Sequence, residues 1–362
     1  MLEDKEGFLY PVVREDICVH CGLCLSVCPF HNQEEAREPI KAFSAFANDE
    51  KIRKDSSSGG IFSLIAKQVI DAGGVVYGAS FDKDWNVHHE CVENESDLWK
   101  LRGSKYAQSN VGESFKLAHD QLRDGRSVLF SGTPCQIAAL RHFLGKEYPG
   151  LLTVDLVCHG VPSPGVWRWY LDNVKKDILP LVSSINFRNK DYGWRKYSIA
   201  FDLIQSDVSV RQHFYHRDEP YMKAFFSNLN LRPSCSSCRV KAGRSHSDLT
   251  LADFWNVDKV VEKVDDDKGI SLVLANTQKG LLFLNSLQGA QSQTVDFNQA
   301  IQYNKAWMIS YPNNPNRNRF FALFRRHDGD FTQFVDHSLK PVSTLSTKLR
   351  RGIKHLLGRI LK

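Results

Sequence analysis

Residues 127–136 read Ser127-Val128-Leu129-Phe130-Ser131-Gly132-Thr133-Pro134-Cys135-Gln136 and lead from an apolar strand into a helix. Pro134 suits the first helical position, where its missing N–H is not needed. The helix continues through 137–141, and residues 151–157 follow as a second buried strand. Strand, helix and strand in alternation predict an α/β layer with parallel strands, whose ligands gather at the carboxyl ends of the strands.

Two cysteines lie at those carboxyl ends. Cys135 falls in the first helical turn, where the helix dipole is expected to lower the pKa of a thiol, and Cys158 follows the second strand. Cys135 would also suit a nucleophile, since Pro134-Cys135-Gln136 is similar to the catalytic cysteine motif of cytosine-5 DNA methyltransferases. That interpretation lacks a Gly-rich cofactor fingerprint near the N-terminus.

Upstream, Ser56-Ser57-Ser58-Gly59-Gly60 precedes a predicted helix at 61–70, for which the serines are good N-caps. A buried strand is predicted at 75–79. A serine- and glycine-rich loop at a helix N-terminus offers free N–H groups that suit cofactor phosphates. The alternative is an ordinary capped helix. The basic loop 101–106 would meet a cofactor or lie in water.

Downstream, residues 185–188 and 197–201 alternate apolar and polar side chains and predict β-strands with one solvent-facing side. Two further thiols, Cys235 and Cys238, follow in a tight polar loop, and residues 247–254 are again strand-like.

Four cysteines near the start of the chain, Cys18, Cys21, Cys24 and Cys28, are followed by Pro29. This is the bacterial ferredoxin run that binds a [4Fe–4S] cluster, because one tight loop can present several thiolates to the cube. A zinc site would need only two close pairs of ligands, and disulfides would need an oxidising compartment. The run predicts an outer [4Fe–4S] cluster on these four cysteines and a protein that transfers electrons.

Composition is that of an ordinary soluble globular protein: 362 residues, 42% hydrophobic and 24% charged. The polar first residues do not resemble a signal peptide and no apolar run would span a bilayer, so the nine cysteines predict a cytoplasmic protein with metal-bound thiols. The net charge of +6 lies in residues 342–362, which hold six Lys and Arg residues and no acid. Removing them leaves 41 basic and 41 acidic residues, so no nucleic-acid partner is expected.

Six segments occur in an order that resembles one protein family: 56–60, 102–106, 132–136, 158–160, 232–238 and 243–254. With the cysteine run they resemble the beta-subunit family of coenzyme F420 (deazaflavin) hydrogenases and dehydrogenases. Its bacterial relatives include proteins encoded within polysaccharide-synthesis loci. The resemblance covers the chain from Cys18 to about Trp255.

The predicted fold class is α+β or α/β. It comprises a ferredoxin-like cluster module at 1–38, an α/β FAD-binding domain with a mixed sheet at 39–180, a β-rich C-terminal part at 181–310 that completes the inner cluster site, and a helical basic tail at 311–362.

The resemblance implies FAD in the α/β domain, with a second [4Fe–4S] cluster beside it. Carried over to matching positions, the FAD contacts would be Ser57, Ser58, Gly59, Gly60, Ser104, Lys105, Tyr106 and Thr133. The inner cluster would be ligated by Cys135, Cys158, Cys235 and Cys238. From spacing alone these four would equally suit core residues or a zinc site. Catalytic residues stay unassigned; the side chains that would face an anionic substrate are His159, Arg188, Arg195 and Lys196.

The chain departs from the pattern of the family in its cysteine run. Larger relatives carry two ferredoxin runs, and in such pairs the fourth cysteine of each run ligates the other cluster. This chain has one run, so either Cys28 folds back to close a single cluster or the native N-terminus lies upstream of Met1. Residues 1–11 resemble the linker between two runs, which favours the second interpretation.

The predicted function is an iron–sulfur flavoprotein oxidoreductase that passes electrons between a ferredoxin-like carrier, or a partner redox subunit, and an organic substrate, with a role in polysaccharide biosynthesis. The alternatives are an electron-transfer subunit without its own substrate site and a non-enzymatic iron–sulfur sensor or scaffold. The basic tail from Leu345 to Lys362 gathers its apolar residues on one helical face, which predicts peripheral contact with the inner membrane surface. A helix docked on the protein body and a partner-binding segment are the alternatives.

Overall fold

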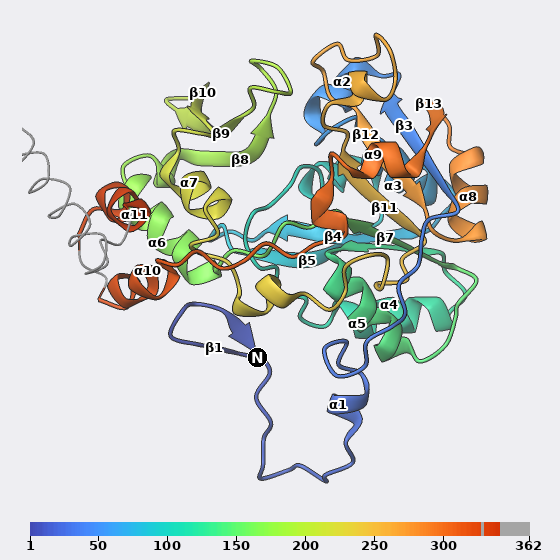
Figure 1. The fold of residues 1–362 in the computed structure, drawn as a ribbon, viewed down its shortest axis with the longest axis horizontal. Helices are drawn as coiled ribbons and strands as arrows, with labels where there is room; N and C mark the ends of the chain where they lie inside the picture. The colour runs from blue at the N-terminus through green and yellow to red at the C-terminus, as the bar shows by residue number, and fades with distance from the viewer. Residues whose placement is uncertain (327–328, 341–362) are drawn as a thin grey trace, which may run out of the picture.

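The computed structural model of the chain describes residues 1–326 and 329–340. Its central element is an eight-stranded sheet in the order β13-β3-β12-β11-β7-β6-β4-β5 (Figure 1). The strands are β3 (Lys41–Ala47), β4 (Val75–Phe81), β5 (Val87–Val92), β6 (Val128–Gly132), β7 (Leu151–Leu156), β11 (Leu249–Asp253), β12 (Ser271–Ala275) and β13 (Ala290–Val295). The sheet is mixed, as predicted, and the parallel strands lie at its centre.

Four strands, β4, β6, β7 and β11, run parallel to one another. Val128 pairs with Val75 on one side and with Leu151 on the other, so the predicted strand–helix–strand unit is confirmed. These strands are apolar along their length because helices cover both faces of the sheet.

The apolar side chains alternate between two helical layers. Val76 and Leu129 pack against α3 (Ile61–Asp71), and α8 (Gln278–Asn285) lies on the same face. Val75 and Phe130 point the other way, toward α4 (Ser114–Arg123) and α5 (Pro134–Leu144), with α9 (Phe297–Ile301) on that face as well. The predicted helix at 61–70 is thus confirmed. Its predicted serine cap is wrong, because Gly60 is the N-cap, with φ of 83° and no side-chain cap bond.

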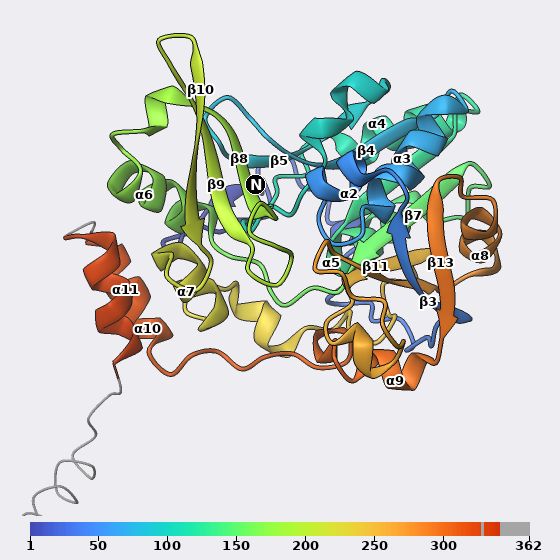
Figure 2. The ribbon, with the colours of Figure 1, turned by 90° about the horizontal axis from the view of Figure 1, so that it is seen from above.

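A second, antiparallel sheet lies beside the first, with β8 (Val182–Asn189), β9 (Ser198–Gln205) and β10 (Val208–Tyr215) in the order β10-β9-β8 (Figure 2). An aromatic-rich core joins it to four helices, α6 (Pro164–Val174), α7 (Pro220–Phe226), α10 (Arg317–Phe324) and α11 (Phe331–Leu339). β10 is largely exposed. The prediction of one solvent-facing side is wrong for the first half of β9, since residues 198–201 of this central strand are all buried.

The chain crosses between the two sheets and returns. Strands β11, β12 and β13 lie in the eight-stranded sheet although they fall within the interval 181–310, whereas residues 182–226 belong to the smaller sheet and its helices. The domain boundaries stay a prediction. The tail from Leu345 to Lys362 lies outside the described residues.

The remaining elements are short. They are β1 (Leu2–Glu3), β2 (Leu9–Tyr10), α1 (Leu23–Ser26), α2 (Glu50–Asp55), η1 (Glu95–Lys100), η2 (Leu179–Leu181), η3 (Pro233–Ser237), η4 (Val257–Lys259) and η5 (Lys305–Trp307). The β1–β2 hairpin is held to the body because Phe8 is fully buried in the aromatic core. The cysteine run between β2 and β3 projects from the body instead (Figure 1).

Candidate functional site

The parallel strands β6, β7 and β11 end at one edge of the large sheet, where ligands of α/β proteins bind. Thr133 caps α5 there: its side chain accepts from the N–H of Gln136, whose side chain accepts from the Thr133 N–H. Pro134 is the first residue of α5, so Cys135 lies in the first turn, as predicted. The Thr133 hydroxyl lies 3.2 Å from the Cys135 sulfur.

The cysteines predicted to form the inner site come together at this edge. Cys135, Cys235 and Cys238 are all close enough to Cys158 to raise the pKa of its thiol by their charges. The larger cause is burial, which also raises the pKa of Cys135, and that of Cys235 to about 11. The expected lowering of the Cys135 pKa by the helix dipole is therefore wrong, because desolvation of the thiolate exceeds it.

Two cations and one amide support these thiols. Arg232 lowers the pKa of Cys135 and of Cys235, and Lys241 lowers that of Cys158. The Val161 N–H donates to the Cys235 sulfur over 3.4 Å. Positive charge and N–H···S bonds are what a buried set of thiolates requires.

A zinc site and a [4Fe–4S] cluster differ in how they bind their thiolates. Within the part of the chain that the structure describes, no three His, Cys, Asp or Glu side chains meet closely enough to hold one metal ion. A zinc ion would need its sulfurs at about 2.3 Å, whereas a [4Fe–4S] cluster takes one thiolate on each of four irons. All nine cysteines are free thiols.

The N-terminal run is open to solvent. Cys21 and Cys24 are exposed, and Cys18 and Cys28 are half-buried. Its loop is built locally: the N–H groups of Leu25 and Ser26 donate to the Gly22 carbonyl, and Gly22 has φ of 73°. Nothing within 4 Å would contact a side chain at Gly22, so the glycine is required by its backbone conformation.

Two of the predicted FAD residues come together from separate loops. The Ser104 N–H donates to the Ser57 hydroxyl over 3.0 Å, and the two hydroxyls lie 3.1 Å apart. Ser58 and Gly59 are instead used in packing: the Ser58 hydroxyl donates to the Ile270 carbonyl at 2.6 Å, and a Cβ at Gly59 would lie 2.4 Å from a backbone oxygen of β3.

Lys105 and Tyr106 are also engaged within the protein. The Lys105 ammonium donates to the carbonyls of Lys100 and Arg102, each at 2.8 Å. Burial lowers its pKa to about 7. The Tyr106 ring packs edge-on against Phe187, with centroids 5.4 Å apart. Lys105 therefore holds its own loop in place.

Next to Tyr106 lies a group of side chains around Asp253, of which the sequence analysis named only Arg188. Arg188 is buried and donates to Asp253 at the end of β11 over 2.8 Å, with its guanidinium 3.9 Å above the Tyr197 ring. Asp253 raises the pKa of Arg188 against the effect of burial. Trp194 also donates to Asp253, and its ring stacks on Trp255 with centroids 4.7 Å apart. An aspartate at the carboxyl end of a predicted strand was the available signal.

The expected anion-facing side chains are largely occupied. Arg188 is paired as described, and Arg195 forms ion pairs with Asp258 and Asp265. His159 bonds to Asn228 at 2.7 Å. Lys196 is exposed.

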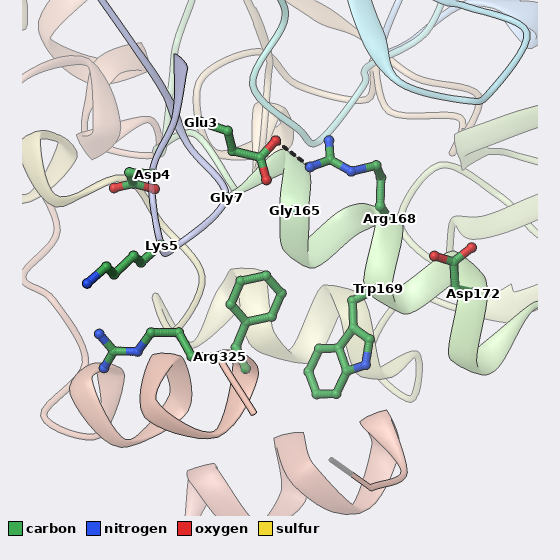
Figure 3. Close-up of a pocket in the computed structure, with 10 residues that line it drawn as sticks. Glu3, Asp4, Lys5, Gly7, Gly165, Arg168, Trp169, Asp172 and Arg325 are labelled. Atoms are coloured by element: carbon green, nitrogen blue, oxygen red, sulfur yellow. Dashed lines mark hydrogen bonds and ion pairs between the residues drawn. The ribbon is translucent and has the colours of Figure 1, made fainter. Parts of the chain in front are cut away.

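A cavity of about 520 Å³ lies away from this edge, between the β1–β2 hairpin, α6 and α10 (Figure 3). In it, Arg168 pairs with Glu3 at 2.5 Å, and Trp169 forms part of the wall. None of the predicted cluster or FAD residues lines it, so this cavity is separate from the site at the sheet edge.

Comparison with known families identifies the chain. Residues 42–116 match the N-terminal domain of the coenzyme F420 hydrogenase/dehydrogenase beta subunit, residues 125–299 match its C-terminal domain, and residues 11–32 match a 4Fe-4S binding domain. The chain belongs to the coenzyme F420 hydrogenase/dehydrogenase beta-subunit family and carries a 4Fe-4S binding domain at its start. The predicted family is confirmed.

Individual relatives are distant. One subunit of the F(420)H(2) dehydrogenase of Methanosarcina mazei is 24% identical over 178 residues, 48% of this chain and 48% of that protein. The coenzyme F420-dependent sulfite reductase of Methanocaldococcus jannaschii is 23% identical over 275 residues, 74% of this chain and 40% of that protein. The chain thus spans about half the length of these relatives or less.

Among solved structures, a chain of the F420-reducing [NiFe] hydrogenase complex of Methanosarcina barkeri matches with a TM-score of 0.48 and 16% identity, over 84% of this chain and 92% of that one. Among the described helices, none combines the length and apolar composition that a membrane crossing requires.

Proposed function

We propose that this chain is an iron–sulfur flavoprotein that passes electrons between a one-electron carrier and an organic substrate. The observation that carries the proposal is the meeting of Cys135, Cys158, Cys235 and Cys238 at the sheet edge where Thr133 begins α5. A bound flavin would supply the conversion between two-electron and one-electron transfer, which a cluster alone lacks.

In this proposal the quartet binds the inner [4Fe–4S] cluster and the run Cys18, Cys21, Cys24 and Cys28 binds the outer one. The match of residues 11–32 to a 4Fe-4S binding domain supports the outer site. The half-buried position of the quartet would limit the access of water to the inner cluster, and the Val161 N–H would tune its potential. The exposed run would be the place where a ferredoxin-like carrier or a partner redox subunit exchanges electrons.

The organic cofactor would lie at Ser57, Ser58, Gly59, Gly60, Ser104, Lys105, Tyr106 and Thr133. FAD is the cofactor we propose there. The curated relatives are named for coenzyme F420, which favours a deazaflavin as the substrate, or as the group bound in place of FAD. The role in polysaccharide biosynthesis and the cytoplasmic location stay predictions.

A second candidate function is an electron-transfer subunit without its own substrate site. One observation favours it: Arg188 is buried and ion-paired with Asp253 within the protein, so its charge is already neutralised. Steady-state turnover of the isolated chain with reduced F420 and an artificial one-electron acceptor separates the two, since the subunit alone would show no turnover.

The proposal is tested by anaerobic reconstitution followed by counting metal, sulfide and cofactor. The expected result is about eight iron and about eight sulfide per chain, with one FAD released on denaturation. Parallel titrations with FAD and F420, followed by absorbance, identify which ring binds. Zinc in place of iron, or a colourless protein that binds neither ring, would refute the proposal.

A further inference from the structure

Lys190, the residue after β8, is buried with 8% of its surface exposed. Its ammonium donates to the Ser58 carbonyl at 2.7 Å, to the Lys268 carbonyl at 2.9 Å and to the Arg53 carbonyl. All three ammonium donors are thereby used. Three segments far apart in the sequence meet on one buried cation at the predicted cofactor loop.

The Ser58 carbonyl is held from two sides. On one side it accepts from Lys190; on the other, a Cβ at Gly269 would lie 2.2 Å from its oxygen, so only glycine fits there. Ser58 has φ of 52°, in the left-handed region that disfavours side chains. The Gly59 N–H donates to the Ser271 hydroxyl at 3.0 Å. This strained turn thus depends on its surroundings.

With Ser58 and Gly59 fixed in this way, the preceding side chain, Ser57, faces Ser104. The Ser57–Ser104 contact joins the two loops that the sequence predicts to bind FAD. A change at Lys190 would release the Ser58 carbonyl and, one residue away, move the Ser57 hydroxyl.

Lys190 contributes no exposed charge of its own. Burial lowers the pKa of its ammonium to about 7, while Asp253 and Asp266 raise it and Arg53 and Arg188 lower it. A buried ammonium is retained only where it is well bonded, and here the partners are backbone carbonyls. Its bonds therefore serve the conformation of the chain.

We propose that Lys190 is the positioning residue of the cofactor site, whose ammonium sets the conformation of the Ser57–Gly60 loop and places the Ser57 hydroxyl opposite Ser104. The inference rests on the proposed function, because it takes this loop as part of the cofactor site.

The test is the affinity of cofactor-free protein for FAD, measured by quenching of flavin fluorescence, for wild type and Lys190→Met. We expect the Kd to rise about tenfold or more, since three carbonyls, two of them in buried hydrogen bonds, lose their donor, with iron and sulfide contents unchanged. The matched control is Lys116→Met, an exposed lysine on α4; its Kd should equal that of wild type.

The outcomes are distinguishable. Wild type that binds neither FAD nor F420 refutes the proposed function, whereas wild type that binds its ring no more tightly than Lys190→Met refutes the positioning role alone. A parallel loss of iron would also overturn it, because the effect would then be global. If Lys190→Met does not fold, Lys190→Arg decides: a planar guanidinium cannot reproduce three converging bonds, so a Kd within twofold of wild type contradicts the proposal.

Discussion

The two sets of four cysteines in this chain are built in opposite ways. The run from Cys18 to Cys28 is a single exposed loop whose backbone bonds close within a few residues. The quartet of Cys135, Cys158, Cys235 and Cys238 comes from three separate segments and is half-buried, and burial raises the thiol pKa of Cys135, Cys158 and Cys235.

The difference teaches where each site obtains its stability. A short loop loses little chain entropy when its cysteines are brought together, and it needs no hydrophobic core. The spacing of the cysteines in the sequence is therefore enough to predict the site. A buried site requires the sheet to be folded first, because desolvated thiolates need fixed cations and N–H groups nearby. We therefore expect the exposed site to be labile and the buried site to follow the fold.

The largest effect should come from removing one cysteine of each set. In reconstituted protein, we expect Cys158→Ser and Cys21→Ser each to lose about four iron per chain, from different clusters, since each cluster takes four thiolates. Electron paramagnetic resonance of the reduced variants identifies the cluster that remains. Cys91→Ser is the control and should keep all iron. Loss of the same signal in both variants would mean a single shared cluster.

Part of the stability that the protein loses at acid pH should come from a buried histidine of the eight-stranded sheet. Burial lowers the pKa of His89, which is 5% exposed on β5, from 6.5 to about 4, so the unfolded chain binds its proton more readily. Its contribution to stability is complete above pH 6.5 and is lost as pH falls toward 4, by about 3 kcal/mol. Urea unfolding between pH 7 and pH 4 should show this extra loss in wild type and not in His89→Gln.

The exposed His337→Gln serves as the control for that measurement and should retain the wild-type slope. A wild-type slope in His89→Gln would show that other groups account for the acid sensitivity of the sheet.

The two clusters should lose iron to a chelator at different rates, because their cysteines differ in solvent exposure. An iron chelator added to the oxidised protein should remove iron in two phases that differ about tenfold in rate, because Cys21 and Cys24 are exposed while all four quartet cysteines are half-buried. The fast phase should be missing from Cys21→Ser. One uniform phase in wild type would contradict the contrast between the sites.

The smallest effect should be found on the exposed run itself. Val19 is 81% exposed, so Val19→Ser should change the free energy of unfolding by less than about 0.5 kcal/mol. Val154 on β7 is fully buried, and Val154→Ser should cost about 3 kcal/mol. Equal effects in urea titrations would show that the run packs against something that stabilises the fold.

The elements that sequence analysis located well are those with short-range signals. The helix at 61–70, the strand at 75–79 and the start of α5 at Pro134 follow from periodicity and capping residues, which act within one or two turns. The serine cap was wrong because Gly60 can adopt a left-handed conformation that serine disfavours. The direction of the Cys135 pKa shift was predicted wrongly because it is decided by burial, and burial depends on the folded structure.

The sequence by itself determined the family, the cysteine run and the parallel strands, since spacing and local periodicity are sufficient for each. Only the tertiary structure brought Cys235 to Cys158, Ser57 to Ser104 and Lys190 to the Ser58 carbonyl. Such contacts join residues separated by tens to more than a hundred positions, and their energies arise only after the sheet has removed the groups from water.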